Sequence, residues 1–318
     1  MASITPKLSV LIPTFNREKY IEQALNSVID QEFNDLEIIC SDNASTDNTF
    51  RVLEEYANRY KFIKVFQNKT NLGPVLNWKK CLDQANGEFV HWLWSDDWIE
   101  PNFYLDGFSL IDEYNLSIVS TWNYRYDEND EIQEKYISWQ YSNKIIPGKE
   151  GAKKILFSEN ELPVSPAAYI IKNELVKKYF YMNIPKISEK LDPVNKAVGV
   201  DSLMVIGACM ESKYLATIQK PSVVFRKHQN ISTKLAKDRS LSKMYFIAHI
   251  WFFSKSDLKI SLQDLLTFSI KIINSFRTTL FNIHVLKLLI KFYLSSFLKL
   301  NKLSATTIYN SKRATFVK

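Results

Sequence analysis

Glycine, cysteine and long apolar runs are all scarce in this sequence. Seven glycines in 318 residues exclude a collagen-like or low-complexity chain. The three cysteines Cys40, Cys81 and Cys209 form no Cys-x-x-Cys or Cys/His pair, so neither a zinc site nor a disulfide framework is expected. Uncharged apolar stretches stay below the roughly 18 residues of a spanning helix, and none opens the chain. We therefore expect no spanning helix and a cytoplasmic location.

Acidic side chains are almost missing from the last quarter of the chain. Residues 241–318 hold 12 basic and 2 acidic side chains, whereas residues 1–240 hold 29 basic and 32 acidic ones. Nucleic acid and an anionic membrane surface are the usual partners of such a basic segment. No nucleic-acid-binding motif is present, so a membrane surface is favoured and no nucleic acid partner is expected.

Short apolar runs and helical patterns alternate through the first hundred residues. Strands are expected at 8–12, 36–40, 62–66 and 89–94, with helices between them at 17–31, 48–60 and 74–85. This alternation predicts an α/β fold with a doubly wound, mostly parallel, Rossmann-like sheet. Ligands bind beyond the carboxyl ends of the strands in such sheets.

The rest of the chain is less regular. We expect a helix at 103–114, a strand at 117–126, a polar loop or hairpin at 127–150, a strand and helix within 166–180, a helix at 200–210, a short strand at 222–225 and helices from about 240. The predicted organisation is an α/β domain at 1–235, with halves 1–105 and 106–235, followed by a C-terminal helical extension at 236–318.

Polar clusters follow three of the expected strands, at residues 14–16, 42–47 and 95–97. Because parallel strands end at the same edge of a sheet, the three clusters should meet in one crevice. Asp96 and Asp97 offer carboxylate oxygens that suit Mg²⁺ or Mn²⁺, which in turn hold phosphate oxygens. Taken alone, each cluster is explained as well by turn and helix-capping chemistry.

Four single residues are candidates for ligand contacts or catalysis. Asp42 could accept a hydrogen bond from a nucleotide base and Asn16 could serve the same ligand, although both are ordinary turn residues and Asn16 is a plausible N-cap. His228 could bind metal or phosphate, or be structural. Asp201 opens an apolar helix, where the helix dipole favours a carboxylate whether or not it takes part in catalysis.

Several segments, in sequence order, resemble the motifs of family-2 glycosyltransferases. They are the opening strand at 8–17, a second signature at 42–47, the stretch Asn71-Leu72-Gly73 with Asn77 and 85–89, the end of the metal motif at 95–97, and Phe225-Arg226-Lys227-His228-Gln229-Asn230-Ile231-Ser232, which looks like the family's late R-x-H-x-x-N-x-S segment. The resemblance is strong to about residue 105, patchy to 232 and absent beyond.

The resemblance implies a GT-A fold, a nucleoside diphosphate sugar donor and inversion at the anomeric carbon. Residues 1–105 would bind the donor, with UDP or dTDP favoured, and residues 106–235 the acceptor. The nucleoside pocket would include Pro13, Thr14, Phe15, Asn16 and Asp42. Near the ribose or diphosphate would lie Asn71, Gly73, Asn77 and Ser95. The divalent metal, Mn²⁺ or Mg²⁺, would be held by Asp96, with Asp97 and His228, and Asp201 would be the general base.

Two positions depart from the family's pattern. The metal motif is usually D-x-D-D, but Trp94 replaces its first Asp. Val200 stands where an acidic residue often precedes the base, which leaves three alternative bases open, Glu189, Asp192 and Glu211. The Q-x-x-R-W motif of processive polysaccharide synthases is missing, which favours transfer of a single sugar.

Residues 262–303 predict an amphipathic helix. One basic and polar stripe would contain Asn274, Arg277, His284, Lys287, Lys291, Ser295, Lys299 and Lys302. Such a helix could lie on an anionic membrane, which would suit a lipid-linked saccharide acceptor in surface polysaccharide (O-antigen or capsule) assembly, or it could pack on the α/β domain. Two other functions stay open: a catalytically silent sugar-nucleotide-binding scaffold, and a nucleotidyltransferase, although the Gly-rich phosphate loop of the latter is missing.

Overall fold

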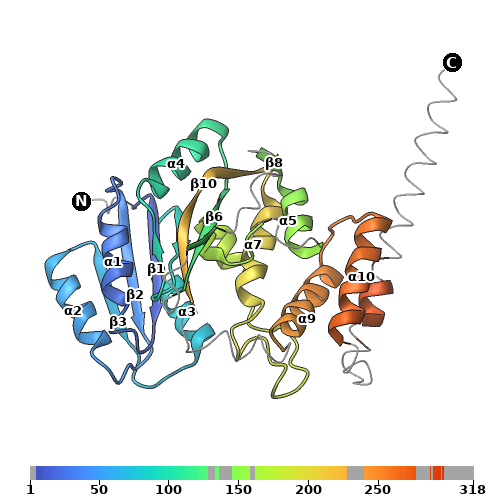
Figure 1. Ribbon diagram of the computed structural model, residues 1–318, viewed down its shortest axis with the longest axis horizontal. Coiled ribbons are helices and arrows are strands. Elements are labelled where there is room, and N and C mark those ends of the chain that lie inside the picture. Colours follow the sequence, from blue (N-terminus) through green and yellow to red (C-terminus); the bar gives the residue numbers. More distant parts are fainter. Residues whose placement is uncertain are drawn as a thin grey trace.

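The computed structural model describes residues 5–127, 133–135, 145–157, 162–227, 240–276, 287, 289–294 and 296. One twisted sheet carries helices on both faces, and two further helices stack beside it (Figure 1). The elements are β1 (Leu8–Thr14), α1 (Ile21–Ile29), β2 (Leu36–Asp42), α2 (Thr49–Arg59), β3 (Ile63–Gln67), α3 (Pro74–Gln84), β4 (Phe89–Trp92), β5 (Trp98–Ile99), α4 (Phe103–Tyr114), β6 (Ile118–Asp127), β7 (Gln133–Lys135), β8 (Ile145–Pro147), α5 (Gly148–Phe157), η2 (Pro166–Ala168), β9 (Tyr169–Lys172), α6 (Asn173–Tyr179), α7 (Val200–Glu211), β10 (Tyr214–Lys227), α9 (Ser240–Lys255) and α10 (Leu262–Phe276).

The described strands form one mixed sheet in the order β3-β2-β1-β4-β9-β6-β10-β5, with β7 beside β6 and β8 beside β10. Strands β1 to β4 run parallel, as do β6 and β10, whereas β9 is antiparallel to both of its neighbours. The parallel register pairs Thr14 with Asp42 and Leu11 with Trp92. The carboxyl ends of these strands therefore meet at one edge of the sheet.

Alternate residues of the central strands face opposite helical layers. Val10 and Ile12 of β1 pack with α1, α2 and α4, whereas Leu11 packs in the cluster formed by α3, α5, α6, α7 and α9. Every residue of β1, β2 and β4 is buried, as expected for parallel strands covered on both faces. The predicted α/β class and mostly parallel central sheet are confirmed.

α1 and β10 differ most in extent from the sequence prediction. α1 begins at Ile21 rather than at residue 17, because the Arg17 carbonyl accepts hydrogen bonds from the amides of Tyr20 and Ile21 and closes a turn first. Asn16, at φ 51°, lies before this turn and does not cap the helix. β10 has 14 residues rather than the short run expected at 222–225, because a register shift around Pro221 lets it pair with β6 on both sides of that residue.

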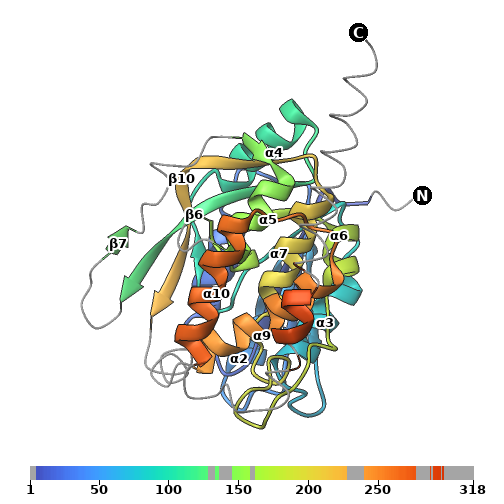
Figure 2. The ribbon, with the colours of Figure 1, turned by 90° about the vertical axis from the view of Figure 1, so that its right-hand side faces the viewer.

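The chain after residue 240 is helical where it is described. α9 packs on α7, and α10 packs on α9 and α5; Figure 2 shows the four helices together on this side of the molecule. Lys287 and Lys291 of the predicted basic stripe are exposed. The side chains of its other members, Asn274, Arg277, His284, Ser295, Lys299 and Lys302, lie outside the described residues. Among the helices that are described, none is long and apolar enough to cross a membrane.

Candidate active site

A cavity of about 510 Å³ lies at the carboxyl edge of the sheet, between the ends of β1 and β4 and the first turns of α3, α7 and α9. Several residues singled out from the sequence line it: Pro13, Thr14, Phe15, Asn71, Asn77, Ser95, Asp96 and Asp201. Asn43 also lines it, so each of the three strand-end clusters contributes to one cavity.

Asn77 joins the ends of β1 and β2 from the first turn of α3. Its side-chain amide donates to the Ser41 carbonyl at 2.8 Å and to the Thr14 carbonyl at 3.5 Å. Its Oδ1 accepts from the Ser41 hydroxyl and from the Asn68 amide, each at 2.8 Å. Buried polar atoms that are fully paired hold a fixed geometry, so this wall of the cavity is preorganised.

Asn43 shapes the turn that precedes α3. Its Nδ2 donates to Asn71 Oδ1 at 2.9 Å and to the Gly73 carbonyl at 3.3 Å, and its Oδ1 accepts from the Leu72 amide at 2.9 Å. Gly73 has φ 80°, a conformation that favours glycine, and Pro74 then occupies the first helical turn. Gly73 therefore shapes this wall through its backbone, while Asn71 and Asn77 line the cavity.

Asp42 and Asn16 lie behind the cavity wall rather than in it. The Asp42 carboxylate accepts hydrogen bonds from the Ser45 hydroxyl, from the Ser45 amide at 3.0 Å and from Gln67 Nε2 at 3.2 Å. The side-chain oxygen of Asn16 accepts from the Thr46 amide at 2.9 Å. Both side chains thus serve turn chemistry in this structure, one of the two explanations that the sequence left open.

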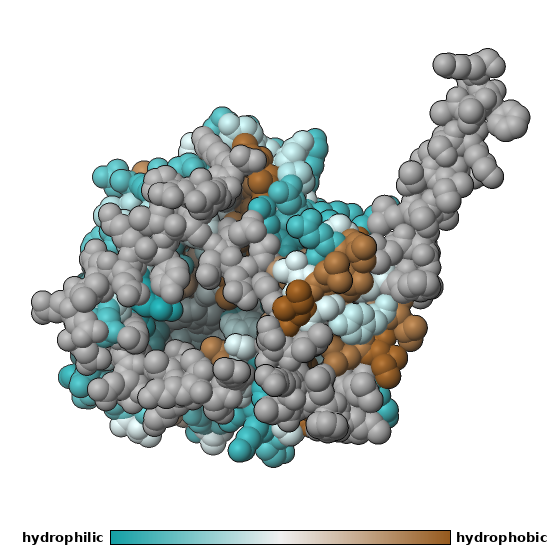
Figure 3. All heavy atoms as spheres, turned by 45° about the vertical axis from the view of Figure 1, so that its right-hand side comes forward, coloured by the Kyte–Doolittle hydropathy of each residue, from teal (hydrophilic) through white to brown (hydrophobic). Residues whose placement is uncertain are grey.

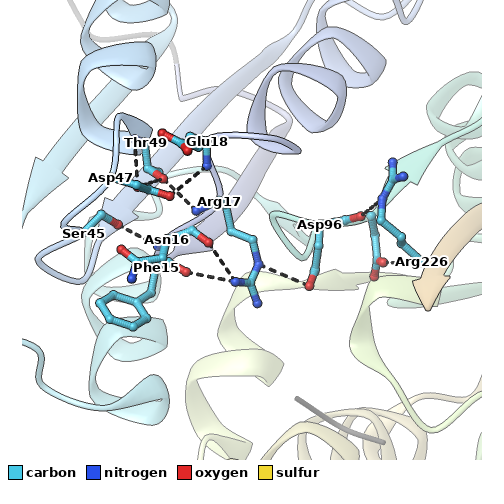
Figure 4. A network of polar contacts seen from close by, with 10 residues as sticks. Phe15, Asn16, Arg17, Glu18, Ser45, Asp47, Thr49, Asp96 and Arg226 are labelled. Atoms are coloured by element: carbon cyan, nitrogen blue, oxygen red, sulfur yellow. Dashed lines mark hydrogen bonds and ion pairs between the residues drawn. The ribbon is translucent and has the colours of Figure 1, made fainter. Parts of the chain in front are cut away.

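Asp96 faces the cavity beside two arginines (Figure 4). Arg17 Nε lies 3.3 Å from Asp96 Oδ2, and the Arg17 guanidinium also donates to the carbonyls of Phe15 and Asn16. Arg226, at the end of β10, donates through Nε to the Asp96 carbonyl at 2.9 Å. These arginines place positive charge around the same end of the cavity.

Asp97 is buried next to Asp96 and is not among the residues that line the cavity. Its Oδ1 accepts from the Arg226 amide at 2.8 Å, which ties the end of the metal motif to β10. Burial, together with the negative charge of Asp96, raises the pKa of the Asp97 carboxyl well above its usual range. His228, the third predicted metal ligand, lies outside the described residues.

Among the side chains at this end of the cavity, Asp96 offers a divalent cation one carboxylate. Within the part of the chain that is described, no group of three His, Cys, Asp or Glu side chains could hold a metal ion. A single protein carboxylate still fits Mg²⁺ or Mn²⁺ when a nucleotide is bound, because substrate phosphates and water commonly supply the remaining ligands. The site therefore fits a cation that arrives with its nucleotide.

Asp201 lies in the first turn of α7 and lines the part of the cavity that α7 and α9 form. Its Oδ1 accepts from the Gly199 amide and its Oδ2 from the Tyr245 hydroxyl, each at 2.8 Å. Burial raises the pKa of its carboxyl to about 6, although both hydrogen bonds oppose the shift. A buried carboxylate with such a pKa is suited to accept a proton near neutral pH.

Helix α9 completes the wall around Asp201. Leu241 and Tyr245, both on the C-terminal side of the predicted boundary at 235/236, line the cavity. The close approach of α9 to α7 requires Gly199, which has φ 91° and whose missing Cβ would lie 2.4 Å from Ala248 Cβ. The first helix of the predicted extension is thus part of the candidate site.

The alternative bases do not line the cavity. Glu211 lies at the far end of α7, where it accepts from Lys178 and Tyr179. Asp192 is bonded to Asn195, and Glu189 is exposed beside Lys186. Asp201 is the carboxylate of this group that the structure brings to the cavity.

Trp94, which replaces the first Asp of the family's metal motif, is an apolar part of the cavity wall. Its ring centroid lies 4.9 Å from that of Trp78, and its indole N–H donates to the Ser165 hydroxyl at 3.0 Å. A carboxylate at this position would lie against Trp78 and Trp92. The neighbouring residues thus accommodate the departure from the motif.

Some lining residues were missed as site residues from the sequence. These are Arg17, Asn43, Trp78, Lys196, Tyr245 and Arg226. Arg17 and Arg226 stood inside quoted motifs, so a count of positive charges near the expected diphosphate could have found them. Lys196 and Tyr245 carry no local signal, because their place depends on how the loop before α7 and helix α9 fold back.

Comparison with known proteins identifies the class that the fold and site define. The family model described as "Glycosyl transferase family 2" matches residues 9–180, which is more than half of the chain. This chain belongs to glycosyl transferase family 2, and the resemblance inferred from its motifs is confirmed.

Individual relatives match only part of this chain. Poly(ribitol-phosphate) beta-N-acetylglucosaminyltransferase TarS of Staphylococcus aureus (strain Mu50) is 40% identical over 116 residues, which cover 36% of this chain and 20% of TarS. GalNAc(5)-diNAcBac-PP-undecaprenol beta-1,3-glucosyltransferase of Campylobacter jejuni is 47% identical over 93 residues, 29% of this chain and 30% of that protein. The chain therefore spans well under half the length of these relatives.

Solved structures extend the likeness of fold beyond the matched sequence. TarS residues 1–349 in complex with UDP-GlcNAc superpose with a TM-score of 0.56 at 23% identity, covering 85% of this chain and 81% of that one. A mannosyltransferase, PcManGT from Pyrobaculum calidifontis in complex with GDP-Man and Mn²⁺, gives 0.54 at 15% identity, covering 99% and 82%. At these identities the comparison confirms the GT-A fold.

Proposed function

We propose that this chain transfers one sugar, with inversion at the anomeric carbon, from a nucleoside diphosphate sugar to a hydroxyl group of a saccharide acceptor. One observation carries the proposal: a single cavity combines the strand-end residues of the donor side with the buried carboxylate of Asp201 on the acceptor side. We favour UDP as the nucleotide, because the structural neighbour TarS is in complex with UDP-GlcNAc and with UDP, and we include dTDP because thymine has the same hydrogen-bonding edge as uracil.

The donor would bind along β1 and α3. Pro13, Thr14 and Phe15 would flank the nucleoside, with Asn71 and Asn77 near the ribose or diphosphate. The turns that position this wall would be held by hydrogen bonds of Asn16, Asp42 and Gly73, which do not line the cavity themselves. Ser95 lies beside Asp96 at the cavity and would contact the diphosphate end.

The leaving nucleoside diphosphate needs positive charge as the bond to the sugar breaks. Arg17, Arg226 and Lys196 line the cavity and supply it from the protein. A divalent cation held by Asp96, with His228 as a further ligand, would add to this charge when it is bound. Asp97 would support the position of Asp96 through its bond to Arg226.

Asp201 would act as the general base. The acceptor hydroxyl oxygen bonds to the anomeric carbon as the bond from that carbon to the diphosphate oxygen breaks, and the hydroxyl proton passes to Asp201. With a pKa raised to about 6, the carboxyl is mostly ionised at pH 7 and still basic enough to take the proton. The base of inverting glycosidases plays the same role towards water, and here a sugar hydroxyl takes the place of that water.

We further propose that the acceptor is a lipid-linked saccharide of surface polysaccharide synthesis, and that the protein works at the inner, anionic face of the cell membrane. Two observations support this part: the 12 basic and 2 acidic side chains of residues 241–318, and the undecaprenol diphosphate acceptor in the name of the Campylobacter relative. Anionic lipids attract such basic segments.

Thermal unfolding with nucleotides tests the donor site directly. UDP, dTDP, GDP and CMP would each be added with and without Mn²⁺, because a ligand that binds the folded state raises the unfolding midpoint. We expect the largest rise with UDP or dTDP and a further rise with Mn²⁺. No rise with any nucleotide would contradict the proposal. A rise without any transfer to saccharide acceptors would instead support a catalytically silent sugar-nucleotide-binding scaffold.

A further inference from the structure

The outer side of α10 exposes an apolar ladder. Leu262, Leu266 and Ile270 follow at four-residue spacing and are 61%, 56% and 60% exposed. At about 3.6 residues per turn they project from one side of the helix. On another side α10 buries Phe268, whose ring centroid lies 5.6 Å from that of Phe246 on α9. α10 thus exposes an apolar stripe, next to the exposed Gln263 and Thr267, in addition to the side that it packs on the protein.

The helical residues 289–294 repeat this arrangement. Leu289 and Phe292 are buried, with the Phe292 ring 5.4 Å from that of Phe268. Ile290 and Leu294 are exposed, and by helical spacing they share a face with the exposed Lys287 and Lys291. We call the exposed set of Leu262, Leu266, Ile270, Ile290, Leu294, Lys287 and Lys291 the docking face. Figure 3 shows hydrophobic side chains gathered on the side of the molecule that carries these helices.

We propose that the docking face seats on an anionic lipid bilayer, with its leucine and isoleucine side chains in the acyl region and its lysines at the headgroups. The inference rests on the proposed function in naming a membrane as the working surface. Its support is charge complementarity: no acidic residue follows Asp264, while basic residues recur to the end of the chain. Apolar side chains rimmed by lysines are the composition of helices that lie in the membrane interface.

The docking face is connected to the cavity through α9. Phe246, which packs against Phe268 of α10, adjoins Tyr245, whose hydroxyl binds Asp201. α9 therefore packs on the helix that carries the ladder and also supplies Leu241 and Tyr245 to the cavity. Seating the docking face on a bilayer would thus bring the helices next to the cavity close to a saccharide that is attached to a lipid.

Vesicle co-sedimentation of the full chain tests the proposal. Wild type should bind vesicles of phosphatidylcholine and phosphatidylglycerol, and should bind phosphatidylcholine alone at least about tenfold more weakly. The double variant L266S/I270S should lose about tenfold or more in binding to the anionic vesicles, because each side chain that is no longer inserted weakens partition. The variant K287E/K291E should lose less binding to the anionic vesicles than L266S/I270S does. Added salt should abolish the difference in binding between K287E/K291E and wild type.

A matched control changes an exposed leucine away from this face. L105S, on α4, removes a leucine that is 39% exposed and should leave vesicle binding unchanged. Equal binding by wild type and L266S/I270S would overturn the proposal. So would concentration-dependent dimerisation that L266S/I270S abolishes in the absence of lipid, since a second copy would then be the occupant. The UDP-dependent thermal shift, measured on the same samples, reports the donor site separately and should not change.

Discussion

The two walls of the cavity are built on different physical principles. The wall that we assign to the donor, here called the donor wall, is a network of paired amides and hydroxyls, in which Asn43 and Asn77 each bind several neighbours. The wall that we assign to the acceptor, here called the acceptor wall, has the buried carboxylate of Asp201, which accepts hydrogen bonds from the Gly199 amide and the Tyr245 hydroxyl. The hydrogen bonds give the donor wall a fixed shape. The acceptor wall instead holds a carboxylate in a buried environment that disfavours its ionised form.

This difference has a consequence for stability. Because the pKa of Asp201 in the folded state is raised to about 6, the folded protein holds this proton more tightly than the unfolded chain does. The contribution of Asp201 to the free energy of unfolding therefore falls as pH rises from about 4 to about 6, and stays low above that. Keeping this carboxylate ionised at neutral pH costs stability, which is a common feature of catalytic groups.

Removing the charge of Asp201 should have the largest effect of the changes considered. Asp201→Asn keeps the size of the side chain but cannot accept a proton, so turnover should fall about 10³-fold. The UDP-dependent thermal shift should be unchanged, and the unfolding midpoint at pH 8 should not decrease. Release of UDP from a UDP-sugar in the presence of acceptor is the measurement.

Glu211→Gln is the matched control, because Glu211 lies on the same helix at its far end, outside the cavity. It should retain nearly full turnover. If Glu211→Gln abolished transfer while Asp201→Asn did not, the acceptor wall would have been assigned to the wrong end of α7.

The second largest effect should separate Asp96 from Asp97. Asp96→Asn removes a carboxylate that lines the cavity, and the Mn²⁺-dependent part of nucleotide binding should weaken about 100-fold, in the range seen when metal-site residues are changed. Asp97→Asn should change binding less than about threefold. The carboxyl of Asp97 has a pKa raised by burial and by Asp96, and an amide oxygen can still accept from the Arg226 amide. Titration of both variants with UDP and Mn²⁺ measures the contrast, and equal losses would contradict it.

The sequence predicted the donor wall better than the acceptor wall, and the reason is how far apart the contributing residues lie. Thr14 and Asp96 stand at or beyond the ends of buried strands, and the parallel register brings any such residues to one edge. Tyr245 reaches Asp201 only because α9 packs across α7 at Gly199, a contact between distant segments that no local pattern encodes.

Burial marks the limit of prediction even on the donor side. Asp42 and Asp96 both follow strands and both looked able to bind a ligand. Of the two, Asp96 lines the cavity with a side chain that is 21% exposed, whereas Asp42 is fully buried with its carboxylate hydrogen-bonded to Ser45 and Gln67. Local sequence shows which residues stand at a strand end, but hydrogen-bond partners decide which of them stay accessible.

A smaller effect should follow from loosening the donor wall. Asn43→Ala leaves the Leu72 amide without its partner and removes one of the two hydrogen bonds to Asn71 Oδ1, which should cost about 1–3 kcal/mol of stability and weaken UDP binding about tenfold. Asn195→Ala removes an exposed asparagine that bonds Asp192 away from the cavity, and should change UDP binding little. Calorimetric titration with UDP measures both variants. Equal affinities for all three proteins would show that the Asn71–Gly73 turn does not shape the donor site.

The smallest effect should come from the one tyrosine that binds the candidate base. The Tyr245 hydroxyl stabilises ionised Asp201, so Tyr245→Phe should raise the pKa of Asp201 above about 6, by about one pH unit. Since Asp201 must be ionised to accept a proton, kcat/KM should fall several-fold at pH 6 and stay nearly unchanged at pH 8. Ser202→Ala is the matched control, because it removes a buried bond between α7 and α9, from Ser202 to His249 at 3.0 Å, without touching Asp201. A pH profile that moves equally in both variants would mean that Tyr245 only holds the helices together, whereas a shift confined to Tyr245→Phe would make it a positioning residue for the base.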